Sequence, residues 1–174
     1  MRVLGVDPGL TRCGVGIIDV NARRQSVFVS VNVIQTPVDA TLSHRLLILE
    51  EGLQELVETF QPNAIAVERV FSQHNVRTAM STAQASAIAL LVAAKHGIAV
   101  AMYTPTEVKA AVTGSGRADK AQVTAMVTKI LKLNEAPKPA DAADALALAL
   151  CHSWRGIGQS RISEALEQLR AVSS

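Results

Sequence analysis

The sequence has few aromatic residues, and this shortage limits the kind of core that it can build. Phe, Trp and Tyr make up 3% of the 174 residues, whereas hydrophobic residues as a whole make up 49%. The core must therefore consist mainly of Ala, Val, Leu and Ile, which need many close contacts between helices and a sheet. This length and composition favour a single layered α/β domain with a sizeable core over a disordered chain.

Cysteines and long apolar runs are also scarce. Cys13 and Cys151 have no Cys or His nearby at the spacing of a zinc site, so we expect two free thiols in a reducing cytoplasm. The most apolar stretch, residues 83–94, is interrupted by Gln84 and Ser86 and is shorter than the roughly 20 apolar residues of a membrane span. The N-terminal residues lead directly into a strand pattern with no signal peptide. We therefore expect a soluble, cytoplasmic protein that does not associate with membranes.

The net charge of +2 is too small to indicate a polyanionic partner, but the basic residues are unevenly distributed. Residues 106–140 contain six Lys or Arg against three Asp or Glu, which gives this segment a local charge of +3. Such a segment is a candidate phosphate-facing surface, and an ordinary solvated surface is the alternative. Its basic residues are Lys109, Arg117, Lys120, Lys129, Lys132 and Lys138, and Arg117 in the Gly-Ser-Gly-Arg loop is a candidate DNA contact.

The spacing of apolar residues predicts a series of strands and helices. The expected strands cover residues 2–7, 13–20, 26–35, 64–67 and 98–103. The expected helices cover residues 42–60, 75–96 and 105–113, a segment after Asp119, and residues 140–154. Residues 1–156 should form one domain, and residues 157–174 a C-terminal tail with a short amphipathic helix over 160–172.

Two helix starts carry specific signals. Thr104-Pro105-Thr106-Glu107 is a capping box with Pro at the first helical position, which places Lys109 on a short helix that ends at Gly114. Asp119 is a suitable N-cap for the next helix. Three antiparallel strands, a helix, and then further strands and helices follow the order of ribonuclease H-like folds. We therefore expect an α/β fold of this type, with a five-stranded mixed sheet flanked by helices.

Four acidic residues occupy positions that structure alone does not explain. Asp7 and Glu68 each end a buried apolar strand. Asp141 and Asp144 are three residues apart at the start of an Ala- and Leu-rich helix, so both face the same way. The alternative for Asp141 is a favourable interaction with the helix dipole, and for Asp7 a turn before Pro-Gly. Glu68 is harder to explain in this way, because a residue directly after Ala-Ile-Ala-Val has little access to solvent.

If the two strands are neighbours and the last helix packs across them, the four carboxylates converge. Such a cluster is tolerable only when cations balance its charge. Ligands that are all oxygen select hard ions, so we expect Mg²⁺, with Mn²⁺ as a substitute. Two such ions suit in-line attack of water on a phosphodiester, which gives a 5′-phosphate and a 3′-hydroxyl.

Four stretches of the sequence resemble the RuvC-type Holliday-junction resolvases. They are Gly5-Val6-Asp7-Pro8-Gly9, Ala66-Val67-Glu68-Arg69-Val70-Phe71, the segment from Val108-Lys109 through Gly114-Ser115-Gly116 to Lys120, and Ala140-Asp141-Ala142-Ala143-Asp144-Ala145-Leu146-Ala147. The first stretch alone is a weak signal, whereas the order and spacing of all four are specific and cover most of residues 1–152.

The resemblance implies a homodimeric nuclease that nicks two symmetry-related strands of a four-way DNA junction and acts with a branch-migration complex of RuvA and RuvB. Asp7, Glu68, Asp141 and Asp144 fall on the metal-binding acids of the family, although some members have His in place of Asp141. Phe71 falls on an aromatic that stacks on bases near the crossover. Lys109 and Lys120 fall on basic positions near the scissile phosphate.

The sequence departs from the family in two places. The region Ala83-Gln84-Ala85-Ser86-Ala87 lacks a basic residue that some members carry, which leaves one DNA contact in doubt. Residues 157–174 have no counterpart. Other interpretations remain open at this point: another ribonuclease H-like nuclease, a non-enzymatic junction-binding protein, or a phosphotransferase of the actin and sugar-kinase type, because Asp7-Pro8-Gly9-Leu10-Thr11 also fits the phosphate loop of those proteins.

The helix over residues 75–96 is the expected dimer interface. Small side chains allow close approach there, and larger apolar ones supply area beyond what the sheet needs; burial of the whole helix in the core is the alternative. The residues expected at the interface are Ala79, Ser81, Ala83, Ala87, Ile88, Leu91 and Val92.

Overall fold

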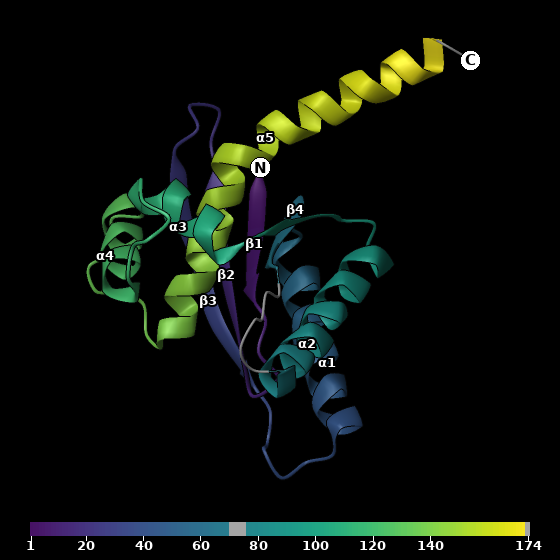
Figure 1. Ribbon diagram of the computed structural model, residues 1–174, viewed down its shortest axis with the longest axis vertical. Helices are drawn as coiled ribbons and strands as arrows, with labels where there is room; N and C mark the ends of the chain where they lie inside the picture. The colour runs from purple at the N-terminus through teal and green to yellow at the C-terminus, as the bar shows by residue number, and fades with distance from the viewer. Residues whose placement is uncertain (70–75, 173–174) are drawn as a thin grey trace.

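The computed structural model describes residues 1–69 and 76–172, and this part of the chain contains a mixed five-stranded sheet (Figure 1). The strand order is β3-β2-β1-β4-β5. The first three strands, β1 (Arg2–Asp7), β2 (Arg12–Val20) and β3 (Ser26–Gln35), form an antiparallel meander. The other two, β4 (Ala64–Glu68) and β5 (Ala99–Tyr103), run parallel to β1. The carboxyl ends of β1, β4 and β5 therefore lie at the same edge of the sheet.

Helices cover both faces of the sheet (Figure 1). One face packs against α1 (Leu42–Phe60) and α2 (Val76–Lys95), and the other against α3 (Pro105–Thr113), α4 (Lys120–Ile130) and α5 (Ala140–Val172). Side chains alternate between the two cores along each strand, so that Val3 faces the α5 side and Leu4 the α1 side. The expected α/β fold of the ribonuclease H-like type, with a five-stranded mixed sheet flanked by helices, is confirmed.

The α5 helix lies unusually close to the sheet because glycines face it. A Cβ atom at Gly5 of β1 would collide with the carbonyl oxygen of Ala145, and one at Gly14 of β2 would collide with that of Asp141. The first turns of α5 can therefore rest on the backbones of β1 and β2 with no side chain between them. This close approach sets the position of the acidic residues at the start of α5.

Most expected elements match the structure, and both capping predictions are confirmed. Thr104 and Glu107 form the reciprocal hydrogen bonds of a capping box, and Asp119 caps α4. The prediction for the last helix was wrong in its end. A single helix, α5, continues to Val172 through Gly156 and Gly158, and residues 155–172 contain no Pro that would end it.

Two smaller expectations also have an outcome. Cys13 and Cys151 are both buried and free, so neither bridges the other. Among the described helices, none combines the length and apolar character that a membrane span requires.

Candidate active site

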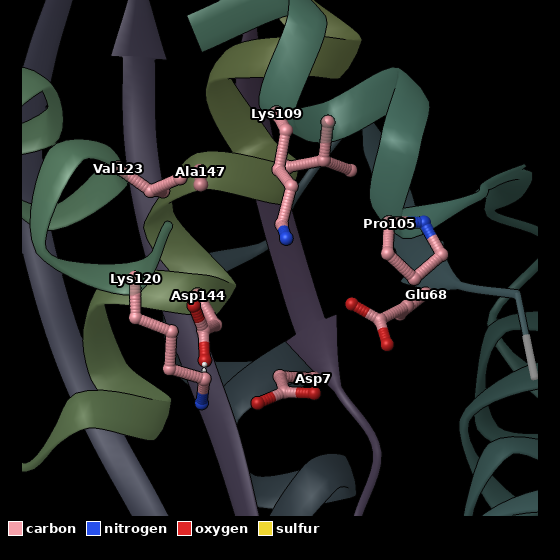
Figure 2. Close-up of a pocket in the computed structure, with 9 residues that line it drawn as sticks. Asp7, Glu68, Pro105, Lys109, Lys120, Val123, Asp144 and Ala147 are labelled. Atoms are coloured by element: carbon pink, nitrogen blue, oxygen red, sulfur yellow. Dashed lines mark hydrogen bonds and ion pairs between the residues drawn. The ribbon is translucent and has the colours of Figure 1, made fainter. Parts of the chain in front are cut away.

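The carboxylates of Asp7, Glu68 and Asp144 line one cavity at the carboxyl edge of the parallel strands (Figure 2). Asp7 is the last residue of β1 and Glu68 the last of β4, and these strands are adjacent, with Val6 opposite Val67. Asp144 comes from the first turns of α5, which cross over β1 and β2. Three segments that are far apart in the sequence therefore bring their acids to the same place.

The cavity has a volume of about 250 Å³ and combines charged and apolar walls. Besides the three acids, its lining consists of Pro105, Val108, Lys109, Lys120, Val123 and Ala147. Figure 2 shows the Lys109 amino group pointing from α3 toward the space between Asp144 and Glu68. The structure thus brings together acids from the sheet edge and bases from α3 and α4.

Burial and repulsion from neighbouring acids disfavour the charged forms of Asp7 and Glu68. Burial, and after it the negative charges of Glu68, Asp144 and Asp141, raises the pKa of Asp7 to about 7, although Lys120 opposes the shift. Burial also raises the pKa of Glu68, with Asp144 adding to the effect and the two lysines of the cavity opposing it. These carboxyls therefore gain strongly from any added positive charge.

The two acids of α5 are instead held by basic side chains. Lys120 donates from Nζ to Oδ2 of Asp144 over 2.9 Å, and the pKa of Lys120 is raised chiefly by this hydrogen bond. Arg12 donates from Nε to Oδ2 of Asp141 over 2.8 Å. Asp141 is close enough to affect the pKa of Asp7 but is not part of the cavity lining. Each acid of α5 thus has one cation from a different element.

The donor set fits a hard divalent cation. All candidate ligands are carboxylate oxygens, which Mg²⁺ and Mn²⁺ prefer. The raised pKa values of Asp7 and Glu68 reflect burial first and neighbouring negative charges second, and a bound cation would offset both. Within the described residues, no three Asp, Glu, His or Cys side chains are arranged as a complete ligand set. The acids therefore surround a common cavity without meeting at one point.

The other predicted DNA contacts differ in their position relative to the cavity. Lys109 is half-buried and lines the cavity, whereas Arg117 is exposed in the loop between α3 and α4 and does not line it. Phe71 lies outside the described residues. Arg12 was not found by sequence reasoning, because its partner Asp141 is 129 residues away. The sequence feature that could have revealed it is the spacing of Arg12 and Gly14, which places both residues on the face of β2 that packs against Asp141.

The chain matches the family described as "Crossover junction endodeoxyribonuclease RuvC" over residues 3–152. A relative of that name from Streptomyces avermitilis is 62% identical over 166 residues, which cover 95% of this chain and 94% of the relative. Another from Salinispora arenicola is 59% identical over 170 residues, with 98% and 97% covered. The chain belongs to the RuvC family. The resemblance inferred from four short motifs therefore extends over almost the whole sequence.

Solved structures agree with this membership. A structure of Thermus thermophilus RuvC superposes with a TM-score of 0.83 at 34% identity and covers 91% of this chain and 97% of its own. T. thermophilus RuvC in complex with Holliday junction substrate superposes with a TM-score of 0.85 at 35% identity, with 90% and 94% covered. The RuvC match includes all four candidate acids, and it sets aside the phosphotransferase interpretation of residues 7–11.

Proposed function

We propose that this chain is a structure-selective endonuclease that resolves Holliday junctions during DNA recombination and repair by paired, symmetric nicks. The observation that carries the proposal is the cavity in which Asp7, Glu68 and Asp144 meet Lys109 and Lys120, in a chain that belongs to the RuvC family. Solved relatives support the substrate, since T. thermophilus RuvC has been captured with a Holliday junction.

We assign metal binding to Asp7, Glu68, Asp144 and Asp141, the last through a rotation away from Arg12. Two bound Mg²⁺ ions, or Mn²⁺ in their place, would supply an activated water and charge neutralisation at the leaving oxygen. The products would carry a 5′-phosphate and a 3′-hydroxyl. The acids' own contribution is to provide oxygen ligands on two rigid strand ends and one helix, whose spacing the sheet and α5 fix.

The basic residues have a separate role in this proposal. Lys109 and Lys120 reach the cavity from α3 and α4, so a phosphate bound there would meet positive charge beside the acids. Val108 and Val123 provide apolar walls beside the lysines, which limit the water around that phosphate. Arg117 and Phe71 are proposed DNA contacts outside the cavity, with Phe71 stacking on a base.

We also propose that the working unit is a homodimer that pairs through α2. An apolar stripe at spacings of three and four residues is exposed along this helix, and we call it the α2 stripe. It consists of Met80, Ala83, Ala87, Leu90, Leu91 and Ala94. The sequence-based set was wrong for Val92, which is buried against the sheet, and Ile88 packs partly against the same core.

The remaining proposals follow from the family. We assign the nuclease domain to residues 1–156, place the protein in the cytoplasm, and name the RuvA and RuvB branch-migration complex as its partner. These assignments depend on the resolvase activity, which is therefore the first property to test.

A nicking assay tests the proposed function. Purified chain should cut a synthetic four-way junction much faster than a linear duplex of the same sequence, only when Mg²⁺ or Mn²⁺ is present, and should leave ends that a ligase can reseal. Equal cutting of both substrates would indicate a different nuclease, and cutting in the presence of a chelator would contradict the metal assignment.

A further inference from the structure

Arg12 is the basic residue next to the candidate acids that neither the motifs nor the proposed function uses. It is the first residue of β2, and its Nε donates to Oδ2 of Asp141 over 2.8 Å. Arg12 and Gly14 are two apart on a strand, so both point toward the same face of the sheet, and Gly14 touches the backbone of Asp141 on that face. The sheet thus aims Arg12 at the first turn of α5.

The contact engages only part of the guanidinium. An arginine has five N–H donors, and Asp141 accepts from Nε alone. The side chain of Arg12 is 42% exposed and that of Asp141 29% exposed. The guanidinium makes no further hydrogen bond or ion pair with the part of the chain that the structure describes. Its two Nη groups are therefore available to a second anion.

Asp141 cannot serve Arg12 and a divalent cation equally well. Oδ2 already accepts a charge-assisted hydrogen bond, and a guanidinium at this distance repels any other cation that approaches the same oxygen. Asp7 and Glu68 differ, because among the described residues neither has a cation in direct contact. Within the described part of the chain, no cation is in contact with these two acids to oppose a metal ion, whereas a metal ion at Asp141 is repelled by the guanidinium for as long as Arg12 stays in place.

A DNA phosphate is the anion that can attract Arg12 away. The guanidinium binds phosphate through two parallel N–H···O bonds, a geometry at least as favourable as its single contact with Asp141. Because the ion pair is exposed, its own stability is small. A bound strand therefore offers Arg12 a new partner at little cost and releases Asp141 to the metal.

We propose that Arg12 is a displaceable counter-ion of Asp141 that couples metal loading to DNA binding. Without DNA it occupies Asp141 and weakens the binding of a divalent ion there; with DNA it moves to a backbone phosphate and Asp141 becomes a ligand. The inference rests on the proposed function, since it takes the acids as metal ligands and DNA as the substrate. It assigns Arg12 a positioning role, distinct from the roles of Lys109 and Lys120.

Metal binding to the DNA-free protein tests the first half of the proposal without any activity measurement. Mn²⁺ titrations followed by calorimetry should show roughly three- to tenfold tighter binding to Arg12→Ala and Arg12→Gln than to the wild type, with Arg12→Lys close to the wild type. Arg2→Ala is the matched control, because Arg2 of β1 pairs with Asp19 of β2 at a similar exposure but far from the candidate acids. It should bind Mn²⁺ like the wild type.

Junction binding tests the second half. Anisotropy of a labelled four-way junction should show that Ca²⁺ raises the junction affinity of the wild type more than that of Arg12→Ala, because metal and DNA affinities are linked reciprocally. The salt slope of Arg12→Ala in Ca²⁺ should also fall by about one unit.

The results distinguish a failure of the role of Arg12 from a failure of the proposed function. Unchanged or weaker Mn²⁺ binding by both Arg12→Ala and Arg12→Gln, in a wild type that binds Mn²⁺ and cuts junctions, overturns the role of Arg12 alone. A wild type that neither binds Mn²⁺ nor cuts junctions overturns the proposed function, and the inference with it. Equal effects of Ca²⁺ on wild-type and Arg12→Ala junction affinity overturn the coupling.

Discussion

At the scale of single residues, the candidate site contains two kinds of carboxylate. Asp7 and Glu68 are largely withdrawn from solvent and repel their neighbours, so the fold raises their pKa values. Asp141 and Asp144 each accept a hydrogen bond from a basic side chain. The strand-end acids therefore gain most from an added cation, whereas each acid of α5 is already paired with a basic side chain of the protein.

The proposed metal ligands should be essential for cleavage and dispensable for binding. Asp7→Asn, Glu68→Gln and Asp144→Asn should each lower the rate of junction cleavage by at least about a thousandfold, which corresponds to roughly 4 kcal/mol of lost transition-state stabilisation. Junction affinity measured by anisotropy in a chelator should change little, because these acids bind metal and not DNA. Asp19→Asn is the control, an acid of the same sheet that pairs with Arg2. Wild-type cleavage in any of the three variants would refute the assignment of that residue.

The raised pKa of Asp7 predicts an unusual pH dependence of stability. The carboxyl titrates near 3.8 in the unfolded chain and at about 7 in the folded, metal-free chain. Between these values the folded chain binds more protons, so the free energy of unfolding should fall as the pH rises from about 4 to 7. Asp7→Asn should therefore be more stable than the wild type at about pH 8, by about 1–3 kcal/mol, and equal to it below about pH 4.

Denaturant unfolding in a chelator at both pH values measures this difference. Asp19→Asn should behave in the opposite way, because Arg2 lowers the pKa of Asp19 and the charged form stabilises the fold. A wild type as stable as Asp7→Asn at about pH 8 would show that the Asp7 carboxylate carries no penalty.

The two lysines of the cavity should contribute to DNA contact and to the reaction. Lys109→Ala and Lys120→Ala should weaken junction binding, slow cleavage, and each reduce the salt slope of binding by about one unit if the amino group meets a phosphate. Lys129→Ala is the matched control, because it removes an exposed lysine from the last turn of α4 and leaves Lys120 in the first. If removing a lysine changes neither the junction affinity, the salt slope of binding nor the cleavage rate, that lysine does not contact DNA.

At the scale of elements, the docking of α5 on β1 and β2 assembles the site. Gly5 and Gly14 leave room for the α5 backbone, which places Asp144 in the cavity and Asp141 within reach of Arg12. Neither glycine has a positive φ, so close approach explains their presence and turn geometry does not. The positions of Asp141 and Asp144 therefore depend on the close packing of α5 against Gly5 and Gly14.

Adding a methyl group at Gly14 should disturb this contact. In Gly14→Ala the new Cβ meets the carbonyl group of Asp141, which is backbone and cannot rotate away, so we expect a loss of about 1–3 kcal/mol in unfolding free energy and slower cleavage. Gly52→Ala is the control, because its Cβ meets only side-chain atoms of Ile34 and the substitution favours helix α1. Thermal unfolding and the nicking assay should separate the two variants; equal stability and activity would show that α5 shifts freely.

Local signals explain which elements could be predicted from the sequence. The Thr104–Glu107 capping box and the Asp119 cap act within four residues, so both helix starts followed from the sequence. The end of α5 was missed because Gly156 and Gly158 favour a helix end near Trp154, whereas the helix continues through both. Arg12 was missed because its partner is distant in the sequence and adjacent only after α5 docks. On α2, apolar residues occur on all sides, so periodicity alone could not show that Val92 faces inward.

At the scale of the whole molecule, one chain offers a single cluster of acids within its described residues. Resolution of a four-way junction requires two nicks in strands of like polarity, and the junction is close to two-fold symmetric. A C₂ dimer with one cavity per subunit is the simplest arrangement that matches this symmetry. The proposed interface must therefore be apolar, exposed and away from the cavity, and the α2 stripe meets these conditions from the opposite face of the sheet.

The α2 stripe predicts the effect of one charge at its centre. Ala87 is exposed between Met80 and Leu91, which are 58% and 48% exposed, and its small side chain permits close approach of a second helix. In Ala87→Arg, a long charged side chain from each subunit would meet its own copy, so sedimentation at micromolar concentration should show a monomer where the wild type is a dimer. The monomer should lose paired nicks while keeping its fold, because Ala87 does not face the core. Val27→Arg, at an equally exposed apolar residue on β3, should remain a dimer. A dimeric Ala87→Arg would place the interface elsewhere. A monomer that still makes paired nicks would contradict the inference that paired nicking requires a C₂ dimer.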